Sequence, residues 1–359
     1  MRTPTLRLDL DAVERNALVW KSRLGACALW PVVKSNGYRL GAVAVARACI
    51  RAGAQRLVIV DVDEAVSLRA AGIEGPLLQI CSTPRAALAD AVRLGVIPTV
   101  DDRACAKALS SIAMWRGQLV RAHVAVDTGT GWSGVPAFHV GSFARDVVTL
   151  PGIEWEGAWT HIAGAATLHD QSVAFAGALD DMRRAGLKIP IAHIASTGPV
   201  VWGAGGDAAR IGVGLYGAAF GDVALAGKLR TAVDLRATVA SVKRFDAPTP
   251  LGYGGSDVAQ PGDVVATLRI GYADGLPRTL RGGGGVRLRG TYCRIAGAIG
   301  MNFTMVKLAP EICDAVVPGD DAVIIGDADR VRLEEVAGAA GVIPQELISR
   351  LGAALKVIT

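Results

Sequence analysis

The sequence predicts an α/β protein, a (β/α)8 TIM barrel followed by a mainly β C-terminal domain. Eight short apolar runs alternate with longer amphipathic runs between residues 28 and 214. The short runs are rich in Val and Ile, as expected of strands buried on both faces, and parallel strands need helical crossovers. Past residue 230, strand-like runs continue without regular crossovers. Eight crossover units in one stretch are typical of a closed barrel.

The barrel strands follow one another at nearly regular intervals. They are expected at 28–34, 56–62, 76–81, 96–100, 121–127, 156–162, 189–195 and 208–214. Helical patterns lie between them, for example at 42–54, 63–73, 84–95 and 173–187, and a short strand at 5–10 precedes the barrel. A doubly wound sheet is the structural alternative. It needs fewer units and usually a Gly-rich dinucleotide loop after its first strand, which the sequence lacks.

The second half of the chain reads as a different domain. Strand-like runs occur at 231–245, 263–273 and 319–326, residues 281–288 read as an exposed turn, and 332–357 supplies at most two helices. We therefore expect a boundary near 225–235, dividing the chain into 1–230 and 231–359.

Composition excludes several classes of function. Hydrophobic residues make up 51% and charged residues 20% of the 359 positions, which describes a soluble protein with a large core. Lys and Arg are scattered without interleaved aromatic residues, so we expect no nucleic-acid partner. No apolar run reaches about 18 residues and the N-terminus reads as a strand, so neither a membrane span nor a signal peptide is expected.

Cysteine and histidine usage points to a cytoplasmic protein without a dedicated metal site. None of the six cysteines falls in a CxxC pair, and the five histidines show no HxxxH pairing. Reduced, buried thiols fit this pattern better than a disulfide framework or a zinc site.

Polar residues gather where the predicted strands end. Chemistry in TIM barrels sits at the C-terminal ends of the strands. Those ends carry Lys34, Asp127, Thr128, Gly129, Thr160, His161, the segment His193 to Thr197, and Arg210. Taken singly, these are a strand-end cation, a turn, an N-cap, a core histidine and a loop ion pair. Their joint placement favours a site.

The C-terminal ends of the strands form the mouth of a TIM barrel. A lysine at this mouth can bind the aldehyde of pyridoxal phosphate, and the phosphate of the cofactor then needs hydroxyls and backbone N–H groups. Ser196 and Thr197 stand at an expected helix N-terminus, which favours an anion. Gly212 and Val213 can offer backbone amides, and Tyr38 can offer a phenol.

Seven motifs carry a family resemblance that runs from about residue 7 to beyond 350. They are KSNGY (34–38), VDTGTGW (126–132), THIA (160–163), RIGVGLYG (210–217), GYGG (252–255), IGYADGLPR (270–278) and GMN (300–302). The sequence resembles the alanine racemases, fold-type III enzymes that depend on pyridoxal phosphate. The runs at 210–217 and 270–278 are the most specific of these matches, whereas the lysine motif alone is not specific.

The resemblance implies a role for each matched position. Lys34 would hold the cofactor and act as one acid/base group, and Tyr253 would be the second, on the opposite face. His161 would hydrogen-bond Tyr253 and help lower its pKa, and Arg210 would face the pyridine nitrogen. The phosphate would be bound by Tyr38, Thr197, Gly212 and Val213, and the substrate entrance would be lined by Tyr272 and Met301.

In this family Tyr253, Tyr272 and Met301 would come from the partner subunit. The resemblance therefore implies a homodimer with composite active sites and a small amino-acid substrate. Residues 1–230 would form the cofactor-binding barrel, and 231–359 would contribute to the partner's site.

The sequence departs from the family where the substrate carboxylate should bind. The family's arginine is Trp132 here, the lysine that supports it is Ala125, and an aspartate is replaced by Asn302. A tryptophan cannot make a bidentate charged contact with a carboxylate. Arg39, which replaces a glycine of the family, or Asn302 could take over that contact.

Three functions stay open on the sequence alone. The first is an amino-acid racemase whose substrate finds its carboxylate partner elsewhere. The second is another pyridoxal-phosphate reaction on the same frame, such as decarboxylation, aldol cleavage or epimerisation. The third is a non-catalytic cofactor-binding protein. Retention of both Lys34 and Tyr253 favours the first.

Overall fold

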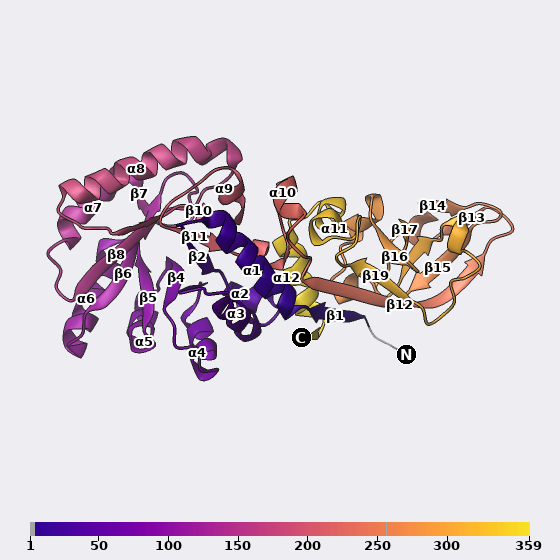
Figure 1. Cartoon of the computed structure of the whole chain (residues 1–359), viewed down its shortest axis with the longest axis horizontal. Helices are drawn as coiled ribbons and strands as arrows, with labels where there is room; N and C mark the ends of the chain where they lie inside the picture. The colour runs from indigo at the N-terminus through magenta and orange to yellow at the C-terminus, as the bar shows by residue number, and fades with distance from the viewer. Residues whose placement is uncertain (1–3, 256) are drawn as a thin grey trace.

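The computed structural model describes residues 4–255 and 257–359. Figure 1 shows an elongated molecule, with the barrel at one end and the β domain at the other. The expected fold class, a (β/α)8 barrel followed by a mainly β domain, is confirmed.

The barrel is a ring of parallel strands in sequence order. Its members are β2 (Ala28–Pro31), β3 (Leu57–Ile59), β4 (Leu77–Ser82), β5 (Val96–Val100), β6 (Val120–Asp127), β8 (Ile153–Trp159), β9 (Ile191–His193) with its continuation β10 (Ala195–Ser196), and β11 (Ala208–Ile211). Strand β11 pairs with both β10 and β2, and a parallel bridge from Val32 to Val58 joins β2 to β3. All eight strands overlap their predicted positions; β2, β3 and β11 are shorter than predicted, and β8 begins and ends three residues earlier.

Helices cover the outside of this ring (Figure 1). They are α3 (Ala42–Arg51), α4 (Val62–Ala70), α5 (Leu88–Arg93), α6 (Arg103–Arg116), α7 (Val140–Val147) and α8 (Leu168–Arg184), with the one-turn helix α9 (Thr197–Val201) near the closing strands. Local signals set their ends. Asp102 caps α6 by accepting the Cys105 N–H at 2.7 Å, and Gly117 ends it with a φ of 62°.

The C-terminal domain is a second, mostly antiparallel barrel. Its sheet order is β15 (Val264–Leu268), β18 (Thr304–Lys307), β17 (Thr291–Ala296), β16 (Gly285–Leu288), β19 (Asp321–Ile325), β12 (Val233–Arg244), β1 (Thr5–Leu8) and β20 (Val357–Ile358). Pairing between β12 and β15 closes it. A hairpin of β13 (Thr249–Leu251) and β14 (Asp257–Ala259) projects from the domain, and helices α11 (Leu333–Ala340) and α12 (Pro344–Ala354) complete it.

Two local predictions need correction. The strand expected at 5–10 ends at Leu8, because Asp9 accepts the N–H groups of Asp11 and Ala12 and so starts helix α1 (Leu10–Leu24). That strand pairs with β12 and β20, so it belongs to the second domain's sheet.

The segment 281–288 is an exposed turn only over its first three residues. From Gly285 it is the largely buried strand β16. A side chain at 285 would collide with the Cys293 carbonyl, so the glycine allows β16 to pack closely on β17.

Polar contacts fasten the two domains together. The Arg332 guanidinium donates to the Ala226 carbonyl at 2.9 Å. The Glu334 carboxylate accepts the N–H groups of Ala219 and Phe220. Within the described residues, no helix is both long enough and apolar enough to cross a membrane.

Candidate active site at the mouth of the barrel

Lys34 lies three residues past the end of β2 and begins an unusual turn. The five residues from Ser35 to Arg39 all have φ between 52° and 68°, although only Gly37 favours that conformation. Three hydrogen bonds hold the turn. The Ser35 N–H donates to the Glu64 carboxylate, and Asn36 Oδ1 accepts the Ala42 N–H at 2.9 Å. The Gly37 carbonyl accepts the Tyr216 hydroxyl. Backbone strain of this kind persists only where its surroundings fix it, and it clusters at functional sites.

A small polar cradle faces this turn. Tyr38 is buried, with its hydroxyl so close to Gly212 that any side chain at 212 would collide with it. Thr197 Oγ1 accepts the Gly212 N–H at 3.1 Å. Val213 begins the short helix η4 (Val213–Tyr216), as Thr197 begins α9 after Ser196. The first N–H groups of a helix lack acceptors inside the helix, so hydroxyls and amides suited to an anion converge here.

Arg210 lies at the end of β11 and is 2% exposed. Its Nη1 donates to His193 Nδ1 at 2.7 Å and to the His193 carbonyl, and its Nη2 donates to the Thr160 carbonyl at 2.8 Å and, at 3.4 Å, to that of Ile194. The Nε–H has no hydrogen-bond partner among residues 4–255 and 257–359. Burial lowers the Arg210 pKa to about 9, which leaves the group cationic at neutral pH.

The rings of His161 and Trp132 lie face to face. Their rings stack with centroids 5.5 Å apart and planes 21° apart, and Trp132 is 80% exposed. Burial, together with the smaller effects of the charges of Arg210 and Lys34, lowers the His161 pKa to about 4. The imidazole is therefore neutral at pH 7.

The loop that carries Trp132 is built around one carboxylate. Asp127 Oδ1 accepts the N–H groups of Gly129, Thr130 and Gly131 at 2.9–3.1 Å. Burial raises the Asp127 pKa, but these three donors outweigh it, so the pKa falls below its ordinary value. The Thr128 and Thr160 hydroxyls are 2.7 Å apart, which joins the loop to the residue that follows β8. The loop around Asp127 is therefore one part of the expected barrel mouth. Ala125 precedes it in β6 and is fully buried.

The remaining predicted site residues lie in the second domain. Tyr253 follows β13 and is 79% exposed, and Tyr272 and Met301 are also exposed, as is Asn302. The Tyr272 N–H donates to the Gly300 carbonyl at 3.0 Å, which joins these segments. Figure 1 shows the β13–β14 hairpin at the end of the molecule away from the barrel, so one chain does not bring Tyr253 to His161.

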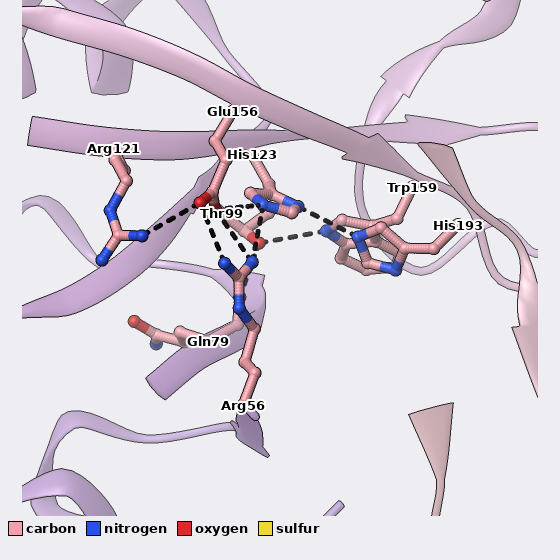
Figure 2. A network of polar contacts seen from close by, with 8 residues as sticks. All are labelled: Arg56, Gln79, Thr99, Arg121, His123, Glu156, Trp159 and His193. Carbon is pink, nitrogen blue, oxygen red and sulfur yellow. Dashed lines mark hydrogen bonds and ion pairs between the residues drawn. The ribbon is translucent and has the colours of Figure 1, made fainter. Parts of the chain in front are cut away.

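Sequence reasoning missed a polar network inside the barrel, which Figure 2 shows. It contains His123 and Glu156, and it includes His193, which was expected at the mouth and instead lies fully buried inside the ring. A signal for it was present, because charged and imidazole side chains inside strands buried on both faces need buried partners.

The chain matches two family models that divide it in the same order as the fold. Residues 8–219 match the alanine racemase N-terminal domain, and residues 232–359 match the alanine racemase C-terminal domain. The chain is 32% identical to alanine racemase 2 of Caldanaerobacter subterraneus subsp. tengcongensis, over 97% of this chain and 92% of that protein. It is also 32% identical to an alanine racemase of Symbiobacterium thermophilum, over 97% and 94% of the two chains.

Solved structures give the same likeness. The alanine racemase of the D-cycloserine producer Streptomyces lavendulae superposes with a TM-score of 0.90 at 32% identity, covering 100% of this chain and 97% of that one. The alanine racemase of Streptomyces coelicolor A3(2) superposes with a TM-score of 0.88 at 28% identity, covering 98% and 97%.

Proposed function

The chain belongs to the alanine racemase family, and we propose that it interconverts the enantiomers of an amino acid with Lys34 and Tyr253 as opposed acid/base groups. Enzymes of this family are isomerases that depend on pyridoxal 5'-phosphate. Two groups on opposite faces of the α-carbon allow a proton to be removed from one side and returned on the other.

The side chains at the barrel mouth fit the cofactor. An amine at Lys34 can hold its aldehyde, and the unspent Nε–H of the buried Arg210 can donate to a ring nitrogen. The cradle of Tyr38, Thr197, Gly212 and Val213, with Ser196 beside it, offers hydroxyls and amides for a phosphate. When bound, the cofactor supplies the electron sink that makes the α-proton of an amino acid acidic.

The observation that carries the proposal is the environment of Arg210. Its four Nη hydrogens are directed at fixed acceptors in the barrel wall, so the guanidinium cannot rotate to serve as an ordinary surface ion pair. An arginine that remains cationic while fully buried keeps a neighbouring ring nitrogen unprotonated. That limits the electron sink and favours proton transfer over competing reactions of the same cofactor.

A second copy of the chain would complete the site. Tyr253, Tyr272 and Met301 are large and exposed, at 79%, 44% and 57%, which is unusual unless such a patch is covered. We propose that they enter the barrel mouth of a second copy, where Tyr253 would meet His161. The assembly is then a homodimer of cytoplasmic protein, with 1–230 as the cofactor domain and 231–359 as the domain that reaches into the other chain.

The proposed site holds the carboxylate of its substrate with other residues than the family's usual arginine. Trp132 stands where a charged partner is expected, and Ala125 cannot support one. We propose that Arg39 or Asn302, both exposed, makes the carboxylate contact instead. Trp132 also favours one alternative, a decarboxylase on the same frame, because a carboxylate without a cationic partner leaves more readily as neutral carbon dioxide.

Replacing Lys34 by alanine tests the cofactor assignment. The Lys34→Ala variant, reconstituted with pyridoxal phosphate and dialysed, is expected to lose the visible absorbance of the bound cofactor and its racemase activity. Lys188→Ala, at an exposed lysine just before the N-terminal end of β9, is the matched control and should keep both. A Lys34→Ala protein with wild-type absorbance would show that another amine holds the cofactor.

A further inference from the structure

A line of hydrogen bonds crosses the interior of the barrel from Glu156 through His123 to His193, as Figure 2 shows, and it continues from His193 to Arg210. Glu156 Oε2 lies 3.0 Å from His123 Nε2, and His123 Nδ1 lies 2.9 Å from His193 Nε2. His193 Nδ1 lies 2.7 Å from Arg210 Nη1. The two imidazoles are completely buried, whereas the Glu156 side chain at the end of the line is 12% exposed.

The chemistry of the two ends fixes the protons between them. A guanidinium can only donate, so His193 Nδ1 must carry a lone pair and its proton must sit on Nε2. That proton is donated to His123, which must accept on Nδ1 and therefore carries its own proton on Nε2. The final acceptor is the Glu156 carboxylate, which only accepts when ionised. Both histidines are thus neutral Nε2–H tautomers, and all the bonds point from Arg210 to Glu156.

A second contact of His123 does not disturb this order. Arg56 Nη1 lies 3.3 Å from His123 Nε2, but it lies closer, at 2.8 Å, to Glu156 Oε2. The arginine hydrogen therefore goes to the carboxylate. Burial lowers the pKa of both His123 and His193, which agrees with neutral rings.

The backbone is shaped to deliver Glu156 to this line. The register between β6 and β8 shifts between Ala122 and His123, so Glu156 is the extra residue of a bulge, a feature that redirects a side chain. Next to it, Gly157 leaves room for the imidazole, because a Cβ there would lie 2.7 Å from His123 Nδ1. Arg56 binds both carboxylate oxygens, and Arg121 binds one of them at 3.1 Å, so the carboxylate is held rigidly.

We propose that Glu156 is a positioning residue of the active site, which acts through His123 and His193 to fix the orientation and charge of Arg210. Each imidazole whose N–H binds a strong acceptor accepts more strongly at its other nitrogen, so the pull of the carboxylate is passed along the line. Arg210 is then held with its Nε–H free for a ligand. That this ligand is the ring nitrogen of the cofactor rests on the proposed function.

The Glu156→Gln variant tests the proposal, because its amide has one acceptor where the carboxylate has two. Oε1 accepts from Arg56 and Arg121, whereas Oε2 accepts from Arg56 and His123. The amide oxygen is expected to stay with the two arginines, which turns the NH2 group toward His123. His123 should then carry its proton on Nδ1, and His193 should lose its hydrogen bond from Arg210.

Nitrogen-15 NMR of the cofactor-free protein reads the tautomer of each histidine directly. The wild type is expected to show Nε2–H at both His123 and His193, and Glu156→Gln should lose that pattern at both. Glu154→Gln, at an exposed position of the same strand, is the control and should match the wild type. A wild-type spectrum with the proton on Nδ1 of either histidine overturns the proposal whether or not any variant folds. So does a folded Glu156→Gln protein with unchanged tautomers.

Gly157→Ala is an independent variant that leaves the carboxylate in place. Its methyl group should displace the His123 ring and remove the same His193 signal, and an unchanged spectrum would contradict the proposed route. With ¹⁵N-labelled pyridoxal phosphate bound, Glu156→Gln should also shift the ring-nitrogen signal toward the protonated form. A wild type that binds no cofactor would refute the proposed function alone, because the tautomers are read without it.

Discussion

At the scale of single residues, the barrel mouth keeps the groups that suit a cofactor and lacks the one that suits a substrate carboxylate. Lys34, Arg210 and the Gly212 cradle are all in place. Trp132, however, offers one N–H and an aromatic face stacked on His161. On the proposed function, cofactor binding and substrate selection are separate tasks, and the departure at Trp132 falls among the residues proposed for the second.

Restoring a cation at that position should restore the ordinary substrate. The Trp132→Arg variant is expected to raise kcat/KM on alanine by about tenfold or more, since a charged hydrogen bond contributes roughly 1.5–3 kcal/mol. The rate is measured with D- and L-alanine in separate assays, with Trp132→Phe as the control for loss of the indole N–H. An unchanged or lower rate in Trp132→Arg would count against this explanation of the carboxylate site.

Sequence could predict the residues at strand ends but not those inside the barrel. Lys34, Thr197 and Arg210 are polar residues that follow apolar runs, so their shared position can be inferred from strand order. Glu156 and His123 meet only because a bulge shifts the register of β8 against β6. A register shift depends on pairing between distant segments, which no local pattern records.

At the scale of elements, the segment after β2 is the most constrained part of the site. Five consecutive residues in the left-handed region cost about 1–2 kcal/mol for each residue other than glycine, so neighbouring elements must hold them there. Glu64 of α4 and the Ala42 N–H of α3 do so. Polar residues follow Lys34 in the sequence, but the handedness of the turn is set by these tertiary contacts.

A β-branched side chain in this turn should be poorly tolerated. Ser35→Val is expected to lower the free energy of unfolding by about 1–2 kcal/mol, because branching at Cβ disfavours a positive φ. Ser35→Asn, which tolerates that conformation, should stay close to the wild type. Both are measured by urea denaturation of the cofactor-free protein. Equal stability of the two variants would argue that the turn is not strained.

At the scale of the whole molecule, the groups proposed for catalysis are divided between two domains that point in different directions. Lys34 lies at the barrel mouth. Tyr253 lies between β13 and β14, in the hairpin that Figure 1 shows at the far end of the second domain. The sequence pattern changes near residue 230, which is where we expect the boundary between the domains. The membership of β1 in the second sheet was not, because it depends on pairing across more than 200 residues.

If two chains share each site, inactive variants should complement one another. Lys34→Ala and Tyr253→Phe are each expected to be inactive alone. Co-expressed in equal amounts, they should regain about a quarter of the wild-type rate, since half of the dimers are mixed and each mixed dimer has one intact site. Purification through two different tags isolates the mixed dimers, which should show about half of the wild-type rate. No recovery in mixed dimers would place both groups in one chain.

The central claim, that this chain racemises an amino acid with two opposed groups, is tested most directly by proton NMR in heavy water. The purified, cofactor-loaded protein is given a panel of amino acids, each as a single enantiomer. The account predicts that the α-proton signal of a substrate is lost while its other enantiomer appears. Conversion of the substrate to an amine or an aldehyde, or exchange of the α-proton with complete retention of configuration, would contradict it.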